Sequence, residues 1–265
     1  MGVGPLIAWR KASLSSLRRT FLMPLTIAFF AGLALLWAGV PGFYPVLSYS
    51  LCFFVFLTTL GEVYRNYRAQ HAALANSDTS GVEQVTRLVR RHRTRYGGHL
   101  VHFGVVVATI SITASMAHKT EKEFSLNKGE STSVGRFTVM LNDITQENNE
   151  NFESVAAKVT AKITATGQVL EVLEPELRFY TRNQETTTEV ALRIGPREDV
   201  YLVLAGVDDS GQRASLKLFI NPLQIWLWIG ILIMLLGGVV VIIPSRKAAR
   251  VESLARSREA TVRNG

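Results

Sequence analysis

The sequence predicts a membrane protein in which an α-helical bundle of about four transmembrane helices carries an inserted small antiparallel β domain, either a barrel or a sandwich. Three observations predict this class. Hydrophobic residues make up 48% of the chain although its formal net charge is +8, so apolar and basic residues must be segregated along the sequence. Several apolar runs reach the length of about 20 residues that a membrane-spanning helix needs. One long segment instead alternates apolar and polar residues with the period of two that is typical of half-buried strands.

Four apolar runs are long enough to span a membrane. They cover Phe21–Val40, Tyr44–Gly61, Leu100–Ala117 and Pro222–Ile243. Because only the short link Pro41–Phe43 separates the first two runs, we expect them to form a helical hairpin. The apolar stretch at residues 1–8 is short and has no basic segment before it, so no cleavable signal peptide is expected.

The distribution of charge predicts how these helices cross the membrane. Basic residues outnumber acidic ones before the first span, between the second and third, and after the fourth, whereas acidic residues are in the majority in residues 118–221. Because Lys and Arg near span ends are retained in the cytoplasm, we expect a multi-pass protein of the bacterial inner membrane with both termini in the cytoplasm. The expected organisation is a cytoplasmic N-terminal segment (1–20), a transmembrane hairpin (21–61), a basic cytoplasmic loop (62–98), a transmembrane helix with histidines (99–117), a periplasmic β domain (118–221), a last transmembrane helix (222–244) and a basic cytoplasmic tail (245–265).

The segment between the third and fourth spans predicts six or seven short strands. Apolar side chains occupy every second position in residues 155–163, and similar alternation recurs in residues 137–141 and 216–220. Turn signals such as Thr166-Gly167 separate these runs. We expect Val155, Val159 and Ile163 to face the core of the β domain.

The excess of Lys and Arg has two interpretations. In a soluble protein it would suggest nucleic-acid binding, but here the basic residues flank apolar spans, so no nucleic-acid partner is expected. Within the basic loop, Glu83–Arg95 predicts an amphipathic helix whose basic face suits an anionic lipid surface. A solvated cytoplasmic connection is the alternative.

Few side chains suit catalysis. Cys52 is the single cysteine and lies in an apolar run, so disulfides, paired-thiol chemistry and cysteine-based metal or haem-attachment sites are excluded. The sequence has no glycine-rich phosphate loop, no HExxH motif and no Ser-His-Asp arrangement. The five histidines are therefore the main candidates for chemistry.

His99 and His102 begin the third span, three residues apart and so on neighbouring positions of one helical face. The opposite face is a stripe of small residues, which lets helices approach closely, so we expect this helix to pack on both sides. The stripe consists of Gly104, Ala108, Ser111 and Ser115. Because imidazole is the commonest haem-iron ligand and ionisable groups inside membranes are usually functional, His102 is a candidate ligand and His99 a weaker one. The alternative is a histidine at a helix start that bonds a carbonyl or interfacial water.

Four further residues are candidates for docking a partner. Trp226 and Trp228 lie near the outer end of the last span, where tryptophans more often anchor a helix at the membrane interface. Arg178 and Tyr180 lie in the β domain, where a structural role within the sheet is the favoured alternative.

Four stretches carry a resemblance to a known family. They are MGVGPLIAWR at residues 1–10, GGHLVHFGV at 97–105, PELRFY at 175–180 with TEVA at 188–191, and NPLQIWLW at 221–228. In this order they resemble the C-terminal portion of the CcmF family, the haem lyase component of the multi-subunit cytochrome c maturation system.

The resemblance implies a b-type haem that two membrane histidines hold, and His102 matches the one in the C-terminal part. No metal other than haem iron is implied, and His99 matches no required histidine. The Trp-rich external motif of the family and its other histidines have no counterpart in this sequence. The chain therefore looks like the C-terminal part of a split lyase or of an interrupted gene, and we do not expect it to be active alone.

The resemblance also implies a reaction and partners. The assembled enzyme would join haem vinyl groups to the reduced thiols of a Cys-x-x-Cys-His segment in an apocytochrome c. The implied partners are the N-terminal half of the split haem lyase with the Trp-rich motif, a haem chaperone, the subunits that handle apocytochrome thiols, and membrane lipid. The alternative is a non-catalytic assembly protein whose β domain docks periplasmic components. A transporter subunit is disfavoured, because the predicted spans lack acidic residues and broken repeats.

Overall fold

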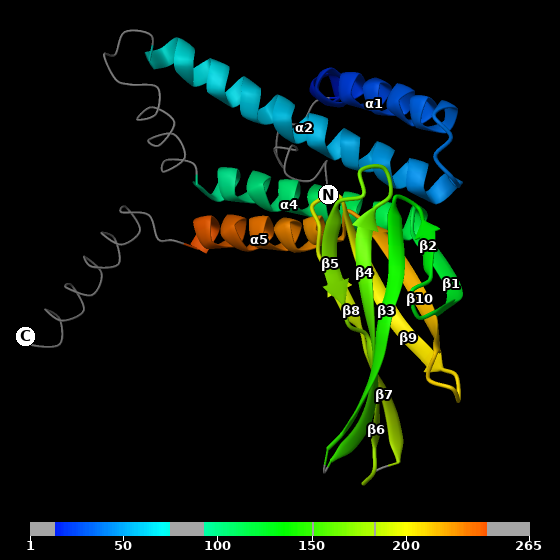
Figure 1. The fold of residues 1–265 in the computed structure, drawn as a ribbon. Helices are drawn as coiled ribbons and strands as arrows, with labels where there is room; N and C mark the ends of the chain where they lie inside the picture. The colour runs from blue at the N-terminus through cyan, green and yellow to red at the C-terminus, as the bar shows by residue number, and fades with distance from the viewer. Residues whose placement is uncertain (1–13, 75–92, 150, 183, 243–265) are drawn as a thin grey trace, which may run out of the picture. The chain divides into compact units, whose positions relative to one another are not determined.

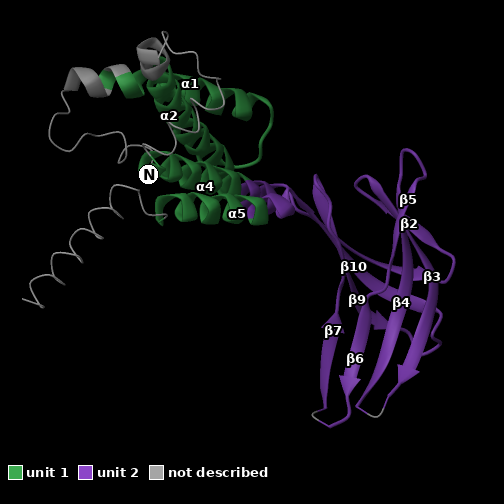
Figure 2. Cartoon of the chain, turned by 90° about the vertical axis from the view of Figure 1, so that its left-hand side faces the viewer, with its two compact units in different colours: residues 1–110, 228–265 green, residues 111–227 purple. Residues whose placement is uncertain are grey.

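The structure is a computed structural model that describes residues 14–74, 93–149, 151–182 and 184–242. The chain divides into two compact units, residues 1–110 with 228–265 and residues 111–227, which we call the helical unit and the β unit (Figure 2). The stretch at residues 1–10, the basic tail and the predicted amphipathic helix lie outside the described residues, except that Arg93–Arg95 begin a helix.

Four helices are α1 (Leu14–Trp37), α2 (Phe43–Leu74), α4 (Arg93–Ala117) and α5 (Gln224–Ile242) (Figure 1). Within the described part of the chain, these 4 helices are long and apolar enough to cross a membrane, which confirms that part of the predicted fold class. The 19 residues of α5 rise about 28 Å at 1.5 Å per residue, close to the roughly 30 Å thickness of a bilayer's hydrocarbon core.

The hairpin of α1 and α2 turns through two glycines. Gly39 and Gly42 have φ angles of 80° and 84°, which glycine adopts without steric cost. The turn brings the rings of Phe21 and Phe54 to a centroid distance of 6.3 Å. Helix α2 continues past the predicted end of the span at Gly61, because residues 62–74 contain neither glycine nor proline.

The β unit is a sandwich of two antiparallel sheets, which confirms the rest of the fold class. The four-stranded sheet has the order β1-β10-β9-β8, and the six-stranded sheet has the order β2-β3-β4-β6-β7 with β5 paired to β4. The strands are β1 (Thr120–Asn127), β2 (Ser131–Val134), β3 (Phe137–Asn148), β4 (Phe152–Ile163), β5 (Val169–Leu173), β6 (Glu176–Tyr180), β7 (Glu185–Glu189), β8 (Ala191–Arg193), β9 (Glu198–Val207) and β10 (Arg213–Pro222).

The core of the sandwich lies between the two sheets. Alternate residues of β3, β4, β9 and β10 supply it, and Val159 is fully buried, as the alternation predicts. Val155 is half-buried against the core, and Ile163 is half-buried at the end of β4. Burial of one valine side chain stabilises a fold by about 1.5–3 kcal/mol, so these strands account for much of the domain's stability.

The structure has more strands than the six or seven that the sequence predicts. Strands β2 and β8 have 4 and 3 residues, too few to show an alternating pattern. Strand β7 has the polar sequence ETTTE and is mostly exposed, so no apolar residue marks it. The long strand β4 pairs with β6 through residues 152–156 and with β5 through residues 159–162, so one strand supports two partners on the same edge.

Candidate functional site

One face of α4 packs directly on α5 through glycines. A Cβ atom on Gly104 would lie 2.6 Å from the carbonyl oxygen of Gly230, and one on Gly230 would lie 2.7 Å from the backbone nitrogen of Ala108. Only hydrogen fits at both positions, so the two backbones meet with no side chain between them. The small-residue stripe of the sequence is therefore the face that α4 presents to α5.

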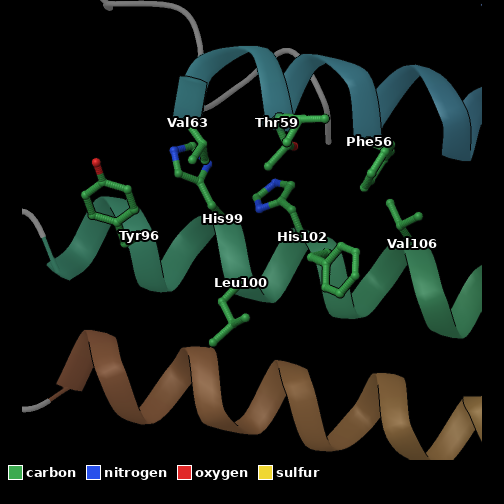
Figure 3. Close-up of a pocket in the computed structure, with 10 residues that line it drawn as sticks. Phe56, Thr59, Val63, Tyr96, His99, Leu100, His102 and Val106 are labelled. Carbon is green, nitrogen blue, oxygen red and sulfur yellow. The ribbon is translucent and has the colours of Figure 1, made fainter. Parts of the chain in front are cut away.

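The opposite face of α4 contacts α2. The rings of Phe103 and Phe56 lie 6.2 Å apart between these helices. Figure 3 shows His99 and His102 directed from α4 toward α2, whereas Leu100 points toward α5. The expectation that this helix packs on both sides is thus confirmed, and both histidines lie on the α2 side.

The ring of His102 is held in one tautomer. Its Nδ1 atom lies 2.7 Å from the carbonyl oxygen of Gly98, one turn earlier in α4. Because a carbonyl oxygen only accepts hydrogen bonds, Nδ1 carries the hydrogen and donates it. With the hydrogen on Nδ1, the neutral form of the ring carries its lone pair on Nε2, and neutral imidazole is the form that binds metal ions.

His99 lies beside a buried carboxylate rather than a carbonyl. Its Nε2 atom is 3.7 Å from Oε1 of Glu62 on α2. Arg95 donates to the same oxygen from Nε at 2.7 Å, and its Nη2 atom lies 2.6 Å from that oxygen in an ion pair. His99 is 8% exposed and Glu62 is 4% exposed. Nε2 of His99 and Oε2 of Glu62 have no hydrogen-bond partner within the described residues. The two histidines thus face the same helix but differ in what their rings contact.

A cavity of about 340 Å³ lies between α2 and α4 (Figure 3). Its volume falls within the range of roughly 300–1,000 Å³ typical of small-molecule and cofactor sites. No group of three or more His, Cys, Asp or Glu among the described residues could hold a metal ion. The lining residues are Phe56, Thr59, Leu60, Val63, Tyr96, His99, Leu100, His102, Phe103 and Val106.

The last two residues of the small-residue stripe connect α4 to the start of α5. Ser111 donates to the carbonyl oxygen of Leu223 at 2.7 Å, and Ser115 donates to the side-chain oxygen of Gln224 at 2.8 Å. Leu223 has a φ of 55°, which is uncommon for a bulky residue. These hydrogen bonds help to hold the chain in this sharp turn from β10 into α5.

The two tryptophans of α5 have different surroundings. Trp226 donates from Nε1 to the carbonyl oxygen of Pro196 at 2.8 Å, so its indole holds the loop that follows β8. Trp228 is 65% exposed, as expected of a side chain that faces lipid. A role for either residue in docking a partner stays a prediction.

Arg178 joins three side chains of the six-stranded sheet. It donates to Glu176 at 2.9 Å and to Glu189 at 3.4 Å, and its guanidinium carbon lies 5.1 Å from the ring centre of Phe152. The hydrogen bond from Arg178 lowers the pKa of Glu176 below its usual range. The ring of Tyr180 lies 5.6 Å from Phe152. These contacts give Arg178 and Tyr180 a role within the sheet, and docking by them stays a prediction.

Glu62 is the polar residue of this site that the sequence did not reveal. The predicted span ended at Gly61, which left Glu62 in a loop and the spans without acidic residues. In the structure, Glu62 lies within the apolar segment Phe43–Arg68 of α2. The sequence does contain a signal for the pair of Glu62 and Arg95. Glu62 directly follows an apolar run, and Arg95 lies near the start of the next span.

Comparisons with known proteins agree with the resemblance. Residues 117–222 match the family model described as the CcmF C-terminal beta-sandwich. The chain is 29% identical over 253 residues to the cytochrome c-type biogenesis protein CcmF of Haemophilus influenzae, covering 93% of this chain and 36% of that protein. It is 28% identical over 260 residues to the cytochrome c-type biogenesis protein ccl1 of Rhodobacter capsulatus, covering 98% of this chain and 37% of that protein.

A solved structure named Cytochrome c Heme Lyase CcmF superposes with a TM-score of 0.66 over 92% of this chain and 37% of its own. The two sequences are 23% identical, so this likeness establishes the fold alone. The chain spans 36% and 37% of the length of the two curated relatives named above. The matched β-sandwich, together with similarity that extends through the membrane helices, makes the chain similar to the C-terminal portion of CcmF proteins.

Proposed function

We propose that this chain is the C-terminal portion of a membrane haem lyase and that His102 supplies one axial ligand of a b-type haem. The observation that carries the proposal is the ring of His102 beside an apolar cavity, with Nδ1 donating to a carbonyl and Nε2 left with a lone pair. The names of the similar proteins, which refer to cytochrome c-type biogenesis and to a heme lyase, support it.

The residues around the cavity fit a porphyrin. Phe56, Leu60, Phe103 and Val106 offer apolar surface to a macrocycle, and His102 offers the one nitrogen that an axial position needs. When bound, a b-type haem supplies a one-electron carrier that could keep the substrate haem ferrous. The protein's own part is to fix the direction of the His102 ring.

Three contacts fix the direction of His102. The carbonyl of Gly98 sets the tautomer and the ring angle. The close approach of Gly104 to Gly230 fixes α4 against α5, and the ion pair of Arg95 with Glu62 fixes α4 against α2. His99 is the weaker ligand candidate, because its Nε2 already lies near the carboxylate.

The second axial ligand would come from the part of the family's length that this chain does not span. The haem would then be shared between this chain and a partner segment that carries the Trp-rich motif. The assembled enzyme would attach haem to the Cys-x-x-Cys-His thiols of an apocytochrome c, together with a haem chaperone and thiol-handling subunits. The β unit would lie in the periplasm of a bacterial inner membrane, where Arg178 and Tyr180 are candidates for docking these partners.

The experiment is complementation of cytochrome c maturation with the chain and its partner segment present. His102→Ala should abolish haem-stained cytochrome c, because the other imidazole beside the cavity, His99, has its Nε2 atom 3.7 Å from the carboxylate of Glu62. The matched control is His118→Ala, which changes an exposed histidine just beyond the other end of α4 and should leave maturation intact. Maturation at the wild-type level in His102→Ala, with the variant present at normal amount in the membrane, would refute the proposal.

A further inference from the structure

Strand β8 and the loop after it carry apolar and basic side chains that the core of the β unit does not use. Leu192 is 49% exposed, and Ile194, two residues later, is 58% exposed. Arg197 is also exposed. We call Leu192, Ile194 and Arg197 the β8 rim. Exposed Leu and Ile beside an exposed Arg combine the apolar and basic side chains that suit a surface at a lipid interface.

The β8 rim is held rigidly rather than as a loose loop. The backbone nitrogen of Gly195 donates to Oδ1 of Asp199 at 2.9 Å, and Asp199 is 5% exposed. The carbonyl oxygen of Pro196 accepts from the indole of Trp226, and the carbonyl oxygen of Arg197 accepts from the backbone nitrogen of Leu223 at 2.8 Å. Both donors belong to the turn and the first residues of α5, so the rim is fixed to the beginning of that helix.

This attachment sets the depth of the β8 rim relative to a membrane. The 19 residues of α5 are only just long enough to cross the hydrocarbon core, so the first turn of α5 must lie at its edge. The headgroup layer adds roughly 5–8 Å on each side. The carbonyl of Pro196 lies 2.8 Å from the indole nitrogen of Trp226 in this first turn, which puts the loop within the headgroup layer.

We propose that the β8 rim is a lipid-contact surface, with Leu192 and Ile194 on the parts of the acyl chains next to the headgroups and Arg197 on anionic lipid phosphates. The occupant is lipid rather than a protein, because hydrogen bonds tie the rim to Leu223 and Trp226 at the start of a helix long enough to cross the bilayer. Interfacial burial accounts for the exposed apolar side chains, and a phosphate layer accounts for the exposed guanidinium. The indole of Trp226 thereby couples the loop to the helix at the depth where tryptophan is favoured.

The test places a fluorescent probe at the β8 rim in the full chain reconstituted in nanodiscs. The single Cys52 is replaced by Cys52→Ala, and an NBD dye is attached at Ile194→Cys. The matched control is Phe179→Cys, which is 42% exposed and belongs to β6, a strand that Figure 1 shows at the other end of the β unit from β8. Lipids with a doxyl group near the headgroup serve as the quencher.

The NBD emission at position 194 should shift to the blue and lose intensity when doxyl lipids are present, while the emission at position 179 should do neither. A blue-shifted emission at 194 without quenching would mean that protein covers the rim and would overturn the proposal. Equal quenching at both positions would also overturn it, since the dye or the whole domain would then adsorb to lipid. The dye at Ile194→Cys also tests the phosphate contact. With Arg197 in place, quenching should be stronger in phosphatidylglycerol than in phosphatidylcholine, and Arg197→Glu should abolish this difference. An unchanged difference would overturn the phosphate contact.

Discussion

Arg95 on α4 donates a hydrogen bond from Nε to a carboxylate oxygen of Glu62 on α2 at 2.7 Å, and its Nη2 atom forms an ion pair with the same oxygen at 2.6 Å. An ionised carboxylate within a membrane span is costly unless a partner compensates it. The pair therefore helps to set how α4 is rotated against α2, and with it the direction in which His102 points.

The coupling between these two residues can be measured with a double-mutant cycle. Glu62→Gln and Arg95→Gln should each destabilise the detergent-purified protein, and the double variant should cost less than the two together. We expect a coupling energy of about 1 kcal/mol, because the guanidinium remains half exposed and solvent screens it. Thermal unfolding followed by circular dichroism gives the comparison. Strictly additive costs would show that the pair does not couple α2 to α4.

The glycine contact of α4 with α5 predicts that two glycine-to-alanine substitutions on α5 differ sharply in their effect on stability. Gly230→Ala places a Cβ 2.7 Å from the backbone of Ala108 and should destabilise the protein by roughly 1–3 kcal/mol, because the helices must separate. Gly238→Ala on the same helix has nothing within 4 Å of its new Cβ and should be neutral or slightly stabilising. Equal melting temperatures for the two variants would argue against direct backbone packing.

The network around Arg178 predicts a pH dependence of the β unit. The hydrogen bond from Arg178 lowers the pKa of Glu176, so its contribution to stability is present above the unfolded-state pKa of about 4.3 and is lost as the pH falls through the lower folded-state pKa. Arg178→Met should therefore destabilise the β unit more at pH 7 than in acid. Arg182→Met, which changes an exposed arginine in the same hairpin, is the control. Protease resistance at several pH values reports the difference, and a pH-independent effect would exclude the carboxylate as its cause.

Reporter fusions test the predicted orientation in the membrane. A reporter after Arg250 or near Asn76, positions outside the described residues, should be cytoplasmic because basic residues surround both sites. A reporter inserted at Gly167 or Asp209, in turns of the β unit, should be exported. Export of the Asn76 fusion would overturn the charge argument.

Hydrophobic patterning predicts most of the fold, because burial is its cause. Apolar runs reveal the four helices, and the alternation around Val159 reveals β4, since both patterns follow from which face meets lipid or core. The exposed polar strand β7 has no such pattern, because its backbone pairing with β6 alone defines it. Helix α2 likewise runs past Gly61, since nothing in the polar residues that follow stops it.

The candidate site is predicted only where its residues are close in sequence. His99 and His102 share one helix, so their spacing places them together. The partners of the other site residues come from distant segments. Glu62 precedes Arg95 by 33 residues, and Pro196 precedes Trp226 by 30. No local pattern encodes such contacts, because they arise only when the elements pack.

The visible spectrum of the assembled complex tests the central proposal most directly. This chain, tagged and co-expressed with the segment that supplies the second ligand, should purify with a b-type Soret band. His102→Ala should lose that band, and added imidazole should restore part of it by occupying the vacated ligand position. His99→Ala should retain most of the band, because His99 lies beside the carboxylate of Glu62. An unchanged Soret band in His102→Ala, or a loss confined to His99→Ala, would contradict the assignment of His102 as the ligand.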